Sequence, residues 1–229
     1  MDEPGVEEAT LTSALEAIER LNRASLVGGR VWARIAPLAR RAASTGKGPL
    51  RVLDLASGGG YLAVEIARRA RREGLPVEVA GSDLNPTSVA FARERARAED
   101  LAVDFFELDC LSGALPTDFD VLTSTLFLHH LGHDEAVAAL SAMARAARRM
   151  VLVNDLARSR PGHLLARIST TLVTRSPMVR FDGPRSVERA FTVPEARELV
   201  REAGLEGARV HGTWPFRLSI EWERPEGVA

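Results

Sequence analysis

The sequence predicts an α/β protein built on a doubly wound, mostly parallel seven-stranded sheet that ends in an antiparallel hairpin. From Arg51 onward, short apolar runs alternate with segments of helical periodicity, a rhythm typical of a parallel sheet covered by helices on both faces. Near the C-terminus, two strand-like runs follow each other with only Trp214-Pro215 between them. A connection this short requires the two strands to pair antiparallel.

Composition bounds the function classes. With 229 residues, 45% of them hydrophobic and 27% charged, the chain suits one globular domain. A formal net charge of −1 gives no general attraction to nucleic acid or to an anionic membrane, although local patches remain possible. Cys110 is the only cysteine, so neither an intramolecular disulfide nor a cysteine-based zinc site can form. No window approaches the ~18 apolar residues that a membrane span requires, and we expect a cytoplasmic protein.

Two amphipathic helices are predicted ahead of the first strand. Apolar residues recur at helical spacing in both: Leu11, Leu15, Ile18 and Leu21, and then Val31, Trp32, Ile35 and Leu38. The turn-forming sequence Gly46-Lys47-Gly48-Pro49 separates them from the sheet. We therefore divide the chain into an N-terminal helical lid segment, residues 1–48, and a main domain, residues 49–229. Plain packing of these helices against the core is an equally open alternative.

Seven strands and four helices are predicted after this turn. The strands lie at Arg51–Leu55, Val77–Ser82, Ala102–Leu108, Asp120–Thr125, Met150–Asn154, Gly207–Thr213 and Phe216–Glu223. The helices lie at Gly60–Arg72, Pro86–Ala98, Asp134–Arg148 and Pro194–Ala203. Asn85-Pro86 is a start signal for the second of them, because it combines a capping side chain with a proline tolerated in the first turn.

Residues 156–190 break this rhythm. They carry a helical apolar pattern at Leu164, Leu165, Ile168, Leu172 and Val173, and prolines flank it at positions 161, 177 and 184. We predict that the segment is an insertion at an acceptor site. Its apolar residues either line a pocket for an apolar or aromatic small molecule or form ordinary core, and the sequence leaves both possibilities open.

The stretch Val-Leu-Asp-Leu-Ala-Ser-Gly-Gly-Gly, residues 52–60, predicts a cradle for a nucleotide or nucleoside. Glycine lets the backbone approach a ligand closely, and a helix that opens just beyond adds free N–H groups and the positive end of its dipole. Gly58-x-Gly60-x-x-Ala63 also satisfies a dinucleotide fingerprint, with Asp83 as the ribose acid. An NAD(P)-dependent oxidoreductase is therefore one alternative.

Three features count against that alternative. A short-chain dehydrogenase needs a lysine four residues after its tyrosine, but Tyr61 is the only tyrosine and position 65 is Glu65. The chain is too short for a separate substrate domain. The terminal hairpin is also out of place in a dinucleotide-binding fold.

From Arg51 to the C-terminus, the chain resembles the class I S-adenosylmethionine-dependent methyltransferases. Four motifs stand in the family's order: residues 52–60, Gly-Ser-Asp-Leu-Asn ending the second strand, Glu-Leu-Asp-Cys after the third, and Thr-Ser-Thr-Leu-Phe-Leu-His-His-Leu from the fourth strand onward. The resemblance implies a Rossmann-like methyltransferase fold. It also implies S-adenosyl-L-methionine as cofactor and S-adenosyl-L-homocysteine as product.

The same resemblance assigns the cofactor residues. Asp54 and the backbone of the glycine loop would hold the methionine moiety, Asp83 the ribose hydroxyls and Asp109 the adenine amino group. Leu84 and Cys110 would flank the adenine ring. The full set is Asp54, Ala56, Ser57, Gly58, Gly60, Asp83, Leu84, Asp109, Cys110 and Ser124. Ala56 replaces the family's usual first glycine, a change of one methyl group at a position where small residues suffice.

His129, His130 and Asp155 are the candidate catalytic residues. The two histidines follow the fourth strand and Asp155 ends the fifth, which is the neighbouring strand in this family's sheet. An imidazole beside a carboxylate can accept a proton from a hydroxyl near neutral pH. The pairing also resembles that of certain small-molecule O-methyltransferases, although one histidine could only cap the following helix. No metal-ligand spacing surrounds the site, so we expect no metal ion.

The leading hypothesis is an O-methyltransferase that acts on a hydroxyl of a small phenolic or polyketide-derived acceptor. It rests partly on a weaker similarity of the segment and C-terminus to methyltransferases associated with polyketide or phenolic-lipid synthesis. Nucleic acid is disfavoured as acceptor, because the place after the fourth strand reads Ser-Thr-Leu-Phe rather than the Pro-Pro-aromatic sequence of adenine-N6 enzymes. Methylation of nitrogen or carbon in another metabolite, or of RNA, remains an alternative. The sequence leaves the oligomeric state open.

Overall fold

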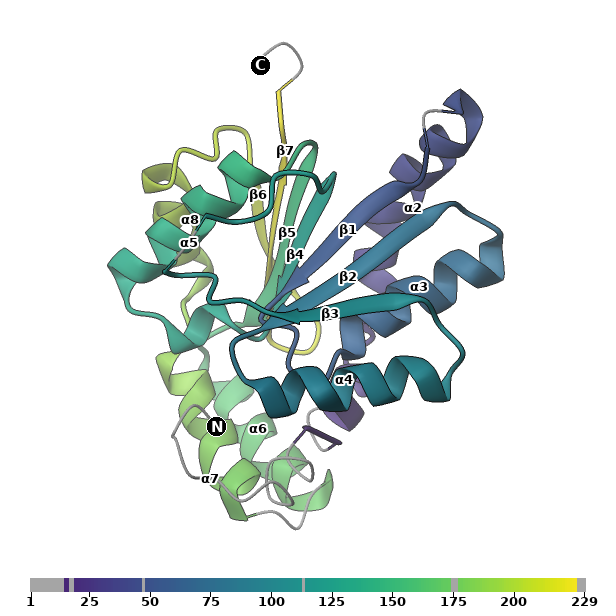
Figure 1. Ribbon diagram of the computed structural model, residues 1–229. Helices are drawn as coiled ribbons and strands as arrows, with labels where there is room; N and C mark the ends of the chain where they lie inside the picture. The colour runs from purple at the N-terminus through teal and green to yellow at the C-terminus, as the bar shows by residue number, and fades with distance from the viewer. Residues whose placement is uncertain (1–14, 17–18, 47, 113, 174–176, 226–229) are drawn as a thin grey trace.

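The computed structural model describes residues 15–16, 19–46, 48–112, 114–173 and 177–225 (Figure 1). Parts of the predicted lid segment, insertion and main domain, including Leu11 and Ile18, lie outside these residues. In the described part, the strands are β1 (Leu50–Leu55), β2 (Val77–Asp83), β3 (Val103–Glu107), β4 (Val121–Thr125), β5 (Met150–Leu156), β6 (Arg209–Thr213) and β7 (Arg217–Glu223). The helices are α2 (Val27–Thr45), α3 (Tyr61–Glu73), α4 (Pro86–Ala98), η1 (Leu128–His130), α5 (His133–Ala146), α6 (Arg160–Val173), α7 (Pro177–Arg189) and α8 (Val193–Glu202).

All seven predicted strands join one sheet in the order β3-β2-β1-β4-β5-β7-β6. The five strands from β3 to β5 run parallel, β7 pairs antiparallel with β5, and β6 pairs antiparallel with β7. The predicted fold class, a mostly parallel sheet with a C-terminal antiparallel hairpin, is therefore confirmed. The order reverses between β1 and β4, where open α/β sheets bind their ligands outside the carboxyl ends of the strands.

The sheet is covered on both faces, because alternate residues of each strand point to opposite sides. In β1, Val52 joins a core shared with α2, α3 and α4, whereas Leu53 and Leu55 join a second core shared with α5 and α8. Figure 1 shows the two helical layers. This arrangement is the doubly wound architecture that the sequence predicted.

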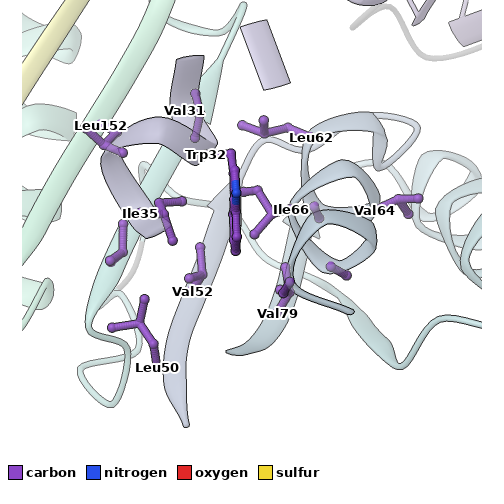
Figure 2. Packing of buried hydrophobic residues seen from close by; sticks show 14 of the residues in the cluster. Val31, Trp32, Ile35, Leu50, Val52, Leu62, Val64, Ile66, Val79 and Leu152 are labelled. Carbon is purple, nitrogen blue, oxygen red and sulfur yellow. The ribbon is translucent and has the colours of Figure 1, made fainter. Parts of the chain in front are cut away.

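The helix α2 is part of the first core. Trp32 and Ile35 are buried between the sheet and α3 (Figure 2). This part of the predicted lid segment therefore packs as a layer on the sheet of the main domain. The helical residues 19–24, which precede α2, are considered with the site below.

Local signals placed the starts of α4 and α8. The Asn85 side chain accepts hydrogen bonds from the N–H groups of Thr87 and Ser88 at the start of α4, as its position before Pro86 predicted. Thr192 and Glu195 form a reciprocal capping box at the start of α8. Each signal lies within four residues of its partner, so it could be recognised without tertiary information.

Residues 156–190 are more regular than the sequence indicated. The described residues of this segment form two helices, α6 and α7, that pack against each other beyond the carboxyl ends of the strands (Figure 1). The apolar residues of the predicted pattern are not core: Leu164, Leu165, Ile168 and Leu172 are exposed. Within the described residues, no helix is long and apolar enough to cross a membrane.

Candidate functional site

The candidate site lies at the carboxyl ends of β1, β2, β4 and β5. Asp54 is in β1, Asp83 ends β2, Ser124 is in β4 and Asp155 is in β5. Ser82 and Ser124 both lie in register with Leu55, one on each side of β1. Parallel pairing thus brings together polar residues that are separated by up to 101 positions in the chain.

The loop after β1 turns through left-handed backbone. Ala56 has φ 50°, Gly58 φ 51° and Gly60 φ 73°. Glycine adopts this region without strain, whereas an alanine there is strained by roughly 1–2 kcal/mol. Position 56 is therefore constrained by its backbone conformation as well as by the size of its side chain.

Two glycines near the cradle are required by packing. A Cβ on Gly60 would lie 2.7 Å from Cζ of Phe105, and one on Gly81 would lie 2.4 Å from Cε1 of the same ring. The aromatic ring of Phe105 therefore fills the space beneath the loop. Gly58 is less restricted, since a Cβ there would meet only the Leu15 side chain at 3.7 Å.

Asp54 is almost completely buried and accepts a hydrogen bond of 2.9 Å from the hydroxyl of Thr123, its register partner on β4. Burial raises the pKa of Asp54 to about 7, against the lowering effect of the Thr123 bond, and the nearby Asp83 charge raises it further. A cation that binds beside this carboxyl group would favour its ionised form.

Asp83 connects the loops that follow β1 and β2. Its Oδ2 accepts from the N–H of Gly58 at 2.7 Å, and its Oδ1 accepts from the N–H of Asn85 at 3.0 Å. These two bonds fix the Asp83 carboxylate beside the glycine loop. The predicted role of Asp83 in cofactor binding stays a prediction, but its role in shaping the cradle is visible.

The predicted adenine neighbours lie on the turn after β3 and the loop after β2. Asp109 accepts hydrogen bonds from the N–H groups of Leu111 and Ser112, and the Leu111 bond is the main cause of its lowered pKa. Burial, followed by the Asp109 charge, raises the pKa of the Cys110 thiol to about 11, so this thiol stays protonated. Leu84 is 67% exposed, which leaves its side chain available to a ligand.

The residues present fit a polar ligand of the predicted kind. Within the described part of the chain, the buried hydroxyls of Ser57, Ser82, Ser124 and Thr125 have no hydrogen-bond partner. A buried hydroxyl without a partner is destabilising by about 1–3 kcal/mol. Their position around the end of β1 is consistent with a bound group that supplies the missing partners. Ser57 and Ser124 were predicted, whereas Ser82 and Thr125 were missed.

The structure brings His129 and Asp155 together. His129 lies in η1, directly after β4, and its Nδ1 is 2.6 Å from Oδ1 of Asp155 on the adjacent strand β5. Its backbone N–H also donates to Oδ2 of the same carboxylate at 3.3 Å. Both side chains are buried. The carboxylate therefore fixes the orientation of the imidazole, an arrangement suited to proton transfer through the other ring nitrogen.

His130 has a different environment. It is exposed, and its ring centroid lies 4.2 Å from that of His129. The helix α7 packs against η1, the element that carries both histidines. His133 begins α5, one residue before the predicted start at Asp134, and its Nε2 is 2.9 Å from Glu202 Oε2.

A buried polar cluster behind Asp155 was missed by the sequence analysis. Arg217 on β7 donates to Asn154 Oδ1 at 3.1 Å and to Asn22 Oδ1 at 2.8 Å, and all three side chains are buried. Burial lowers the pKa of Arg217 to about 10, opposed by the nearby Asp155 charge. Only Asn154, inside the Val-Asn-Asp sequence of β5, carried a local signal that could have found it.

The pKa of Asp155 reflects this cluster. Burial by itself raises it, but the charge and hydrogen bond of His129, the N–H of Leu156 and the Arg217 charge together hold it below its ordinary value. Asp155 is therefore an ionised partner for His129 at neutral pH.

The N-terminal residues cover the glycine loop. Leu15 is 5% exposed, and its Cβ lies 3.4 Å from the position that a Cβ on Gly59 would take. Arg95 on α4 bonds both the Gly59 carbonyl oxygen and the Glu19 carboxylate. These contacts place the helical residues before α2 over the cradle.

Comparison with known proteins finds one matching family model and two curated relatives. Residues 52–149 match the family described as "Methyltransferase domain". Two curated relatives are each named demethylmenaquinone methyltransferase. The protein from Deinococcus radiodurans is 34% identical over 136 residues, which is 58% of this chain and 53% of the relative. The protein from Thermus thermophilus is 35% identical over 109 residues, 47% of this chain and 48% of the relative. The chain thus spans about half the length of the curated relatives it matches.

Solved structures share the fold at low sequence identity. An O-methyltransferase family 2 protein from Planctomyces limnophilus, in complex with apigenin, has a TM-score of 0.68 at 14% identity and covers 98% of this chain and 63% of its own. Magnesium protoporphyrin IX methyltransferase from Synechocystis, with bound S-adenosylhomocysteine, has a TM-score of 0.57 at 18% identity and covers 90% of this chain and 87% of its own.

These findings confirm S-adenosylmethionine as the predicted cofactor at the level of the family, and they set aside the dinucleotide alternative for the glycine loop. The motifs that the sequence placed in the family's order lie where the fold requires them, around the ends of β1, β2, β3 and β4. Residues 52–149 therefore match a methyltransferase domain, and the chain shares the fold of solved methyltransferases, one of them with bound S-adenosylhomocysteine.

Proposed function

We propose that this chain transfers a methyl group from S-adenosylmethionine to the hydroxyl oxygen of a small apolar or aromatic acceptor, with His129 as general base. The observation that carries the proposal is the buried bond of 2.6 Å between His129 Nδ1 and Asp155 Oδ1. This bond lies at the carboxyl ends of the strands, where the glycine loop also lies. The apigenin complex of the Planctomyces protein supports a phenolic acceptor, because apigenin is a phenol bound to a related fold.

The roles of the protein groups follow from their chemistry. S-adenosylmethionine, when bound, supplies a methyl group on a positively charged sulfur. Asp54, Asp83, the loop backbone of Ala56, Ser57, Gly58 and Gly60, and the hydroxyl of Ser124 are proposed to hold it, with Leu84, Asp109 and Cys110 around the adenine. His129 Nε2 takes the proton of the acceptor hydroxyl as the oxygen gains the methyl group. The ionised Asp155 then stabilises the imidazolium, and alignment of the reacting groups contributes roughly 7–11 kcal/mol.

A second candidate is methylation at ring carbon. Both curated relatives are named demethylmenaquinone methyltransferases, and the name denotes a quinone acceptor. A phenol-like ring that loses its hydroxyl proton becomes nucleophilic at the carbon next to that hydroxyl as well as at oxygen. The same His129–Asp155 pair could therefore serve either reaction, and the position of the acceptor decides between them.

Substitution of His129 tests the general base. We expect His129→Ala to lower kcat by about 10²–10⁴-fold, with little change in the Kd of S-adenosylmethionine, because general base catalysis contributes about that factor. Asp155→Asn should also lower kcat, since the imidazolium loses its anionic partner. His130→Ala, measured in parallel, tests the second predicted histidine.

The matched control is His133→Ala, which removes an exposed histidine of α5 and should leave kcat and Kd unchanged. The readout is methyl transfer to a panel of phenols, flavonoids and naphthoquinols, with calorimetry for the cofactor. If His129→Ala retained full turnover while binding the cofactor normally, the general-base role would be wrong. If the wild-type protein did not bind S-adenosylmethionine, the methyltransferase proposal itself would fail.

Isotope labelling distinguishes the two candidate reactions. A cofactor carrying ¹³C in its methyl group yields a product whose carbon shift separates a methoxy group from a methyl group on carbon. A methoxy signal supports the leading proposal, whereas a ring-methyl signal replaces it with the second candidate.

We also propose that the helical residues before α2 act as a lid over the cofactor. Leu15 over the glycine loop and the Arg95 bonds to Glu19 and Gly59 support this role. Bound cofactor should then protect residues 19–24 from hydrogen exchange more than it protects α2.

A further inference from the structure

The two faces of α6 are inverted relative to an ordinary surface helix. Small residues recur every fourth position on the inner face, at Gly162, Ala166 and Thr170, and Thr170 is 3% exposed. A Cβ on Gly183 of α7 would lie 2.6 Å from Cγ2 of Thr170, so the two helices approach closely there. The large apolar side chains of α6 consequently point away from the protein.

The outer face of α6 is aliphatic and open. Leu164 is 58% exposed, Ile168 49% and Leu172 80%, and these residues lie on one stripe at spacing i, i+4, i+8; Leu165 at its edge is 38% exposed. A side chain that lines an enclosed acceptor pocket would be largely covered, so Leu172 does not line one. Contiguous exposed apolar surface of this kind marks an interaction site.

Charge indicates what covers this face. Residues 156–190 contain seven arginines against Asp182 and Glu188, a net charge of +5 in a chain whose total is −1. Arg160 and Arg167 are exposed and flank the stripe on one side. A second copy of this chain would bring two such positive segments together at close range, which is unfavourable. An anionic surface is the complementary partner.

We propose that the α6 stripe docks on an anionic lipid surface, with Leu164, Ile168 and Leu172 inserted at the headgroup boundary and the arginines against lipid phosphates. An aliphatic face with arginines beside it is the pattern of helices that lie in the membrane interface. Since α6 and α7 project from the carboxyl ends of the strands (Figure 1), docking turns the site edge of the sheet toward the lipid. A lipophilic acceptor could then enter from the bilayer, a consequence that rests on the proposed function.

Vesicle co-sedimentation of the full chain, free of cofactor, tests the docking surface. We expect the wild-type protein to bind vesicles of phosphatidylcholine and phosphatidylglycerol at least tenfold more tightly than vesicles of phosphatidylcholine alone, and to be released by salt. The double variant Leu164→Ser, Leu172→Ser should weaken binding by roughly tenfold or more, because two inserted side chains are lost. Arg160→Gln with Arg167→Gln should weaken binding to the anionic vesicles alone, by about fivefold per arginine.

Matched controls use exposed residues elsewhere. Leu26→Ser removes a 63% exposed leucine, and Arg41→Gln with Arg72→Gln removes two exposed arginines of α2 and α3. Both should change binding by less than about twofold. The proposal is overturned if the wild-type protein ignores anionic vesicles, or if light scattering shows a dimer that the double leucine variant converts to a monomer. Vesicle binding is measured without methyl transfer. The docking proposal can therefore fail while the proposed methyltransferase function holds, and the proposed function can fail while docking holds.

Discussion

At the residue scale, Asp54 shows how burial prepares a carboxyl group for a cationic ligand. Its pKa rises from the ordinary value of 3.8 to about 7, chiefly through burial. Between these values the folded chain retains a proton that the unfolded chain releases. The resulting stabilisation is therefore complete below about pH 4 and is lost as the pH rises toward 7.

Replacement of Asp54 by asparagine should remove this pH dependence. We expect the wild-type unfolding free energy, relative to that of Asp54→Asn, to fall between about pH 4 and pH 7 by on the order of 1.4 kcal/mol per pH unit. Urea unfolding of the cofactor-free proteins at a series of pH values measures the difference. Asp104→Asn, an exposed change on β3, is the control and should follow the wild type. Parallel curves for wild type and Asp54→Asn would contradict the raised pKa.

At the element scale, β7 connects the site to the N-terminal residues. Arg217 bonds Asn22, which lies 195 positions earlier in the chain, and its charge acts on Asp155 behind the catalytic candidate His129. A buried guanidinium needs its donors satisfied. The cluster therefore has two effects. It ties Asn22, and with it residues 19–24, to β7, and it places the positive charge of Arg217 near Asp155.

Asn22→Ala should lower the unfolding free energy by about 1–3 kcal/mol, because it leaves a buried Arg217 donor without a partner. It should also speed hydrogen exchange in residues 19–24. Thermal and urea unfolding measure the first effect. As a control, Arg20→Ala breaks an exposed pair with Glu16 at 3.9 Å and should change stability by less than about 1 kcal/mol. Equal effects of the two substitutions would show that Arg217 does not depend on Asn22.

At the scale of the whole molecule, the first core includes α2, so the helix is needed for folding. Ile35 is fully buried against the sheet, and Ile35→Ala should be destabilising by about 2–5 kcal/mol. A helix that served only as a movable lid would tolerate the change, which makes urea unfolding decisive between the two roles. Leu26→Ala, at the exposed start of α2, is the control with an expected effect below about 1 kcal/mol.

The sequence was a good guide wherever the signal was local. Strand periodicity, the Asn85 cap and the Thr192-Glu195 box each depend on residues a few positions apart, and all three are present. For the apolar pattern of residues 156–190 the sequence left a pocket lining and ordinary core both open, because an apolar stripe at helical spacing usually faces the core, and the core alternative is wrong. In α6 it faces outward, since the small residues of the opposite face pack against α7.

The sequence by itself determined the sheet, its antiparallel hairpin, the methyltransferase-like loop and the candidates His129 and Asp155. These features follow from hydrophobic periodicity, turn residues and motif order, which can be read directly from the amino-acid sequence. Tertiary structure alone decided which candidates meet: Asp155 pairs with His129, Thr123 bonds Asp54, and Arg217 reaches Asn22. The physical reason is that hydrogen bonding and burial depend on neighbours in space, and the register of adjacent strands and the packing of distant helices set those neighbours.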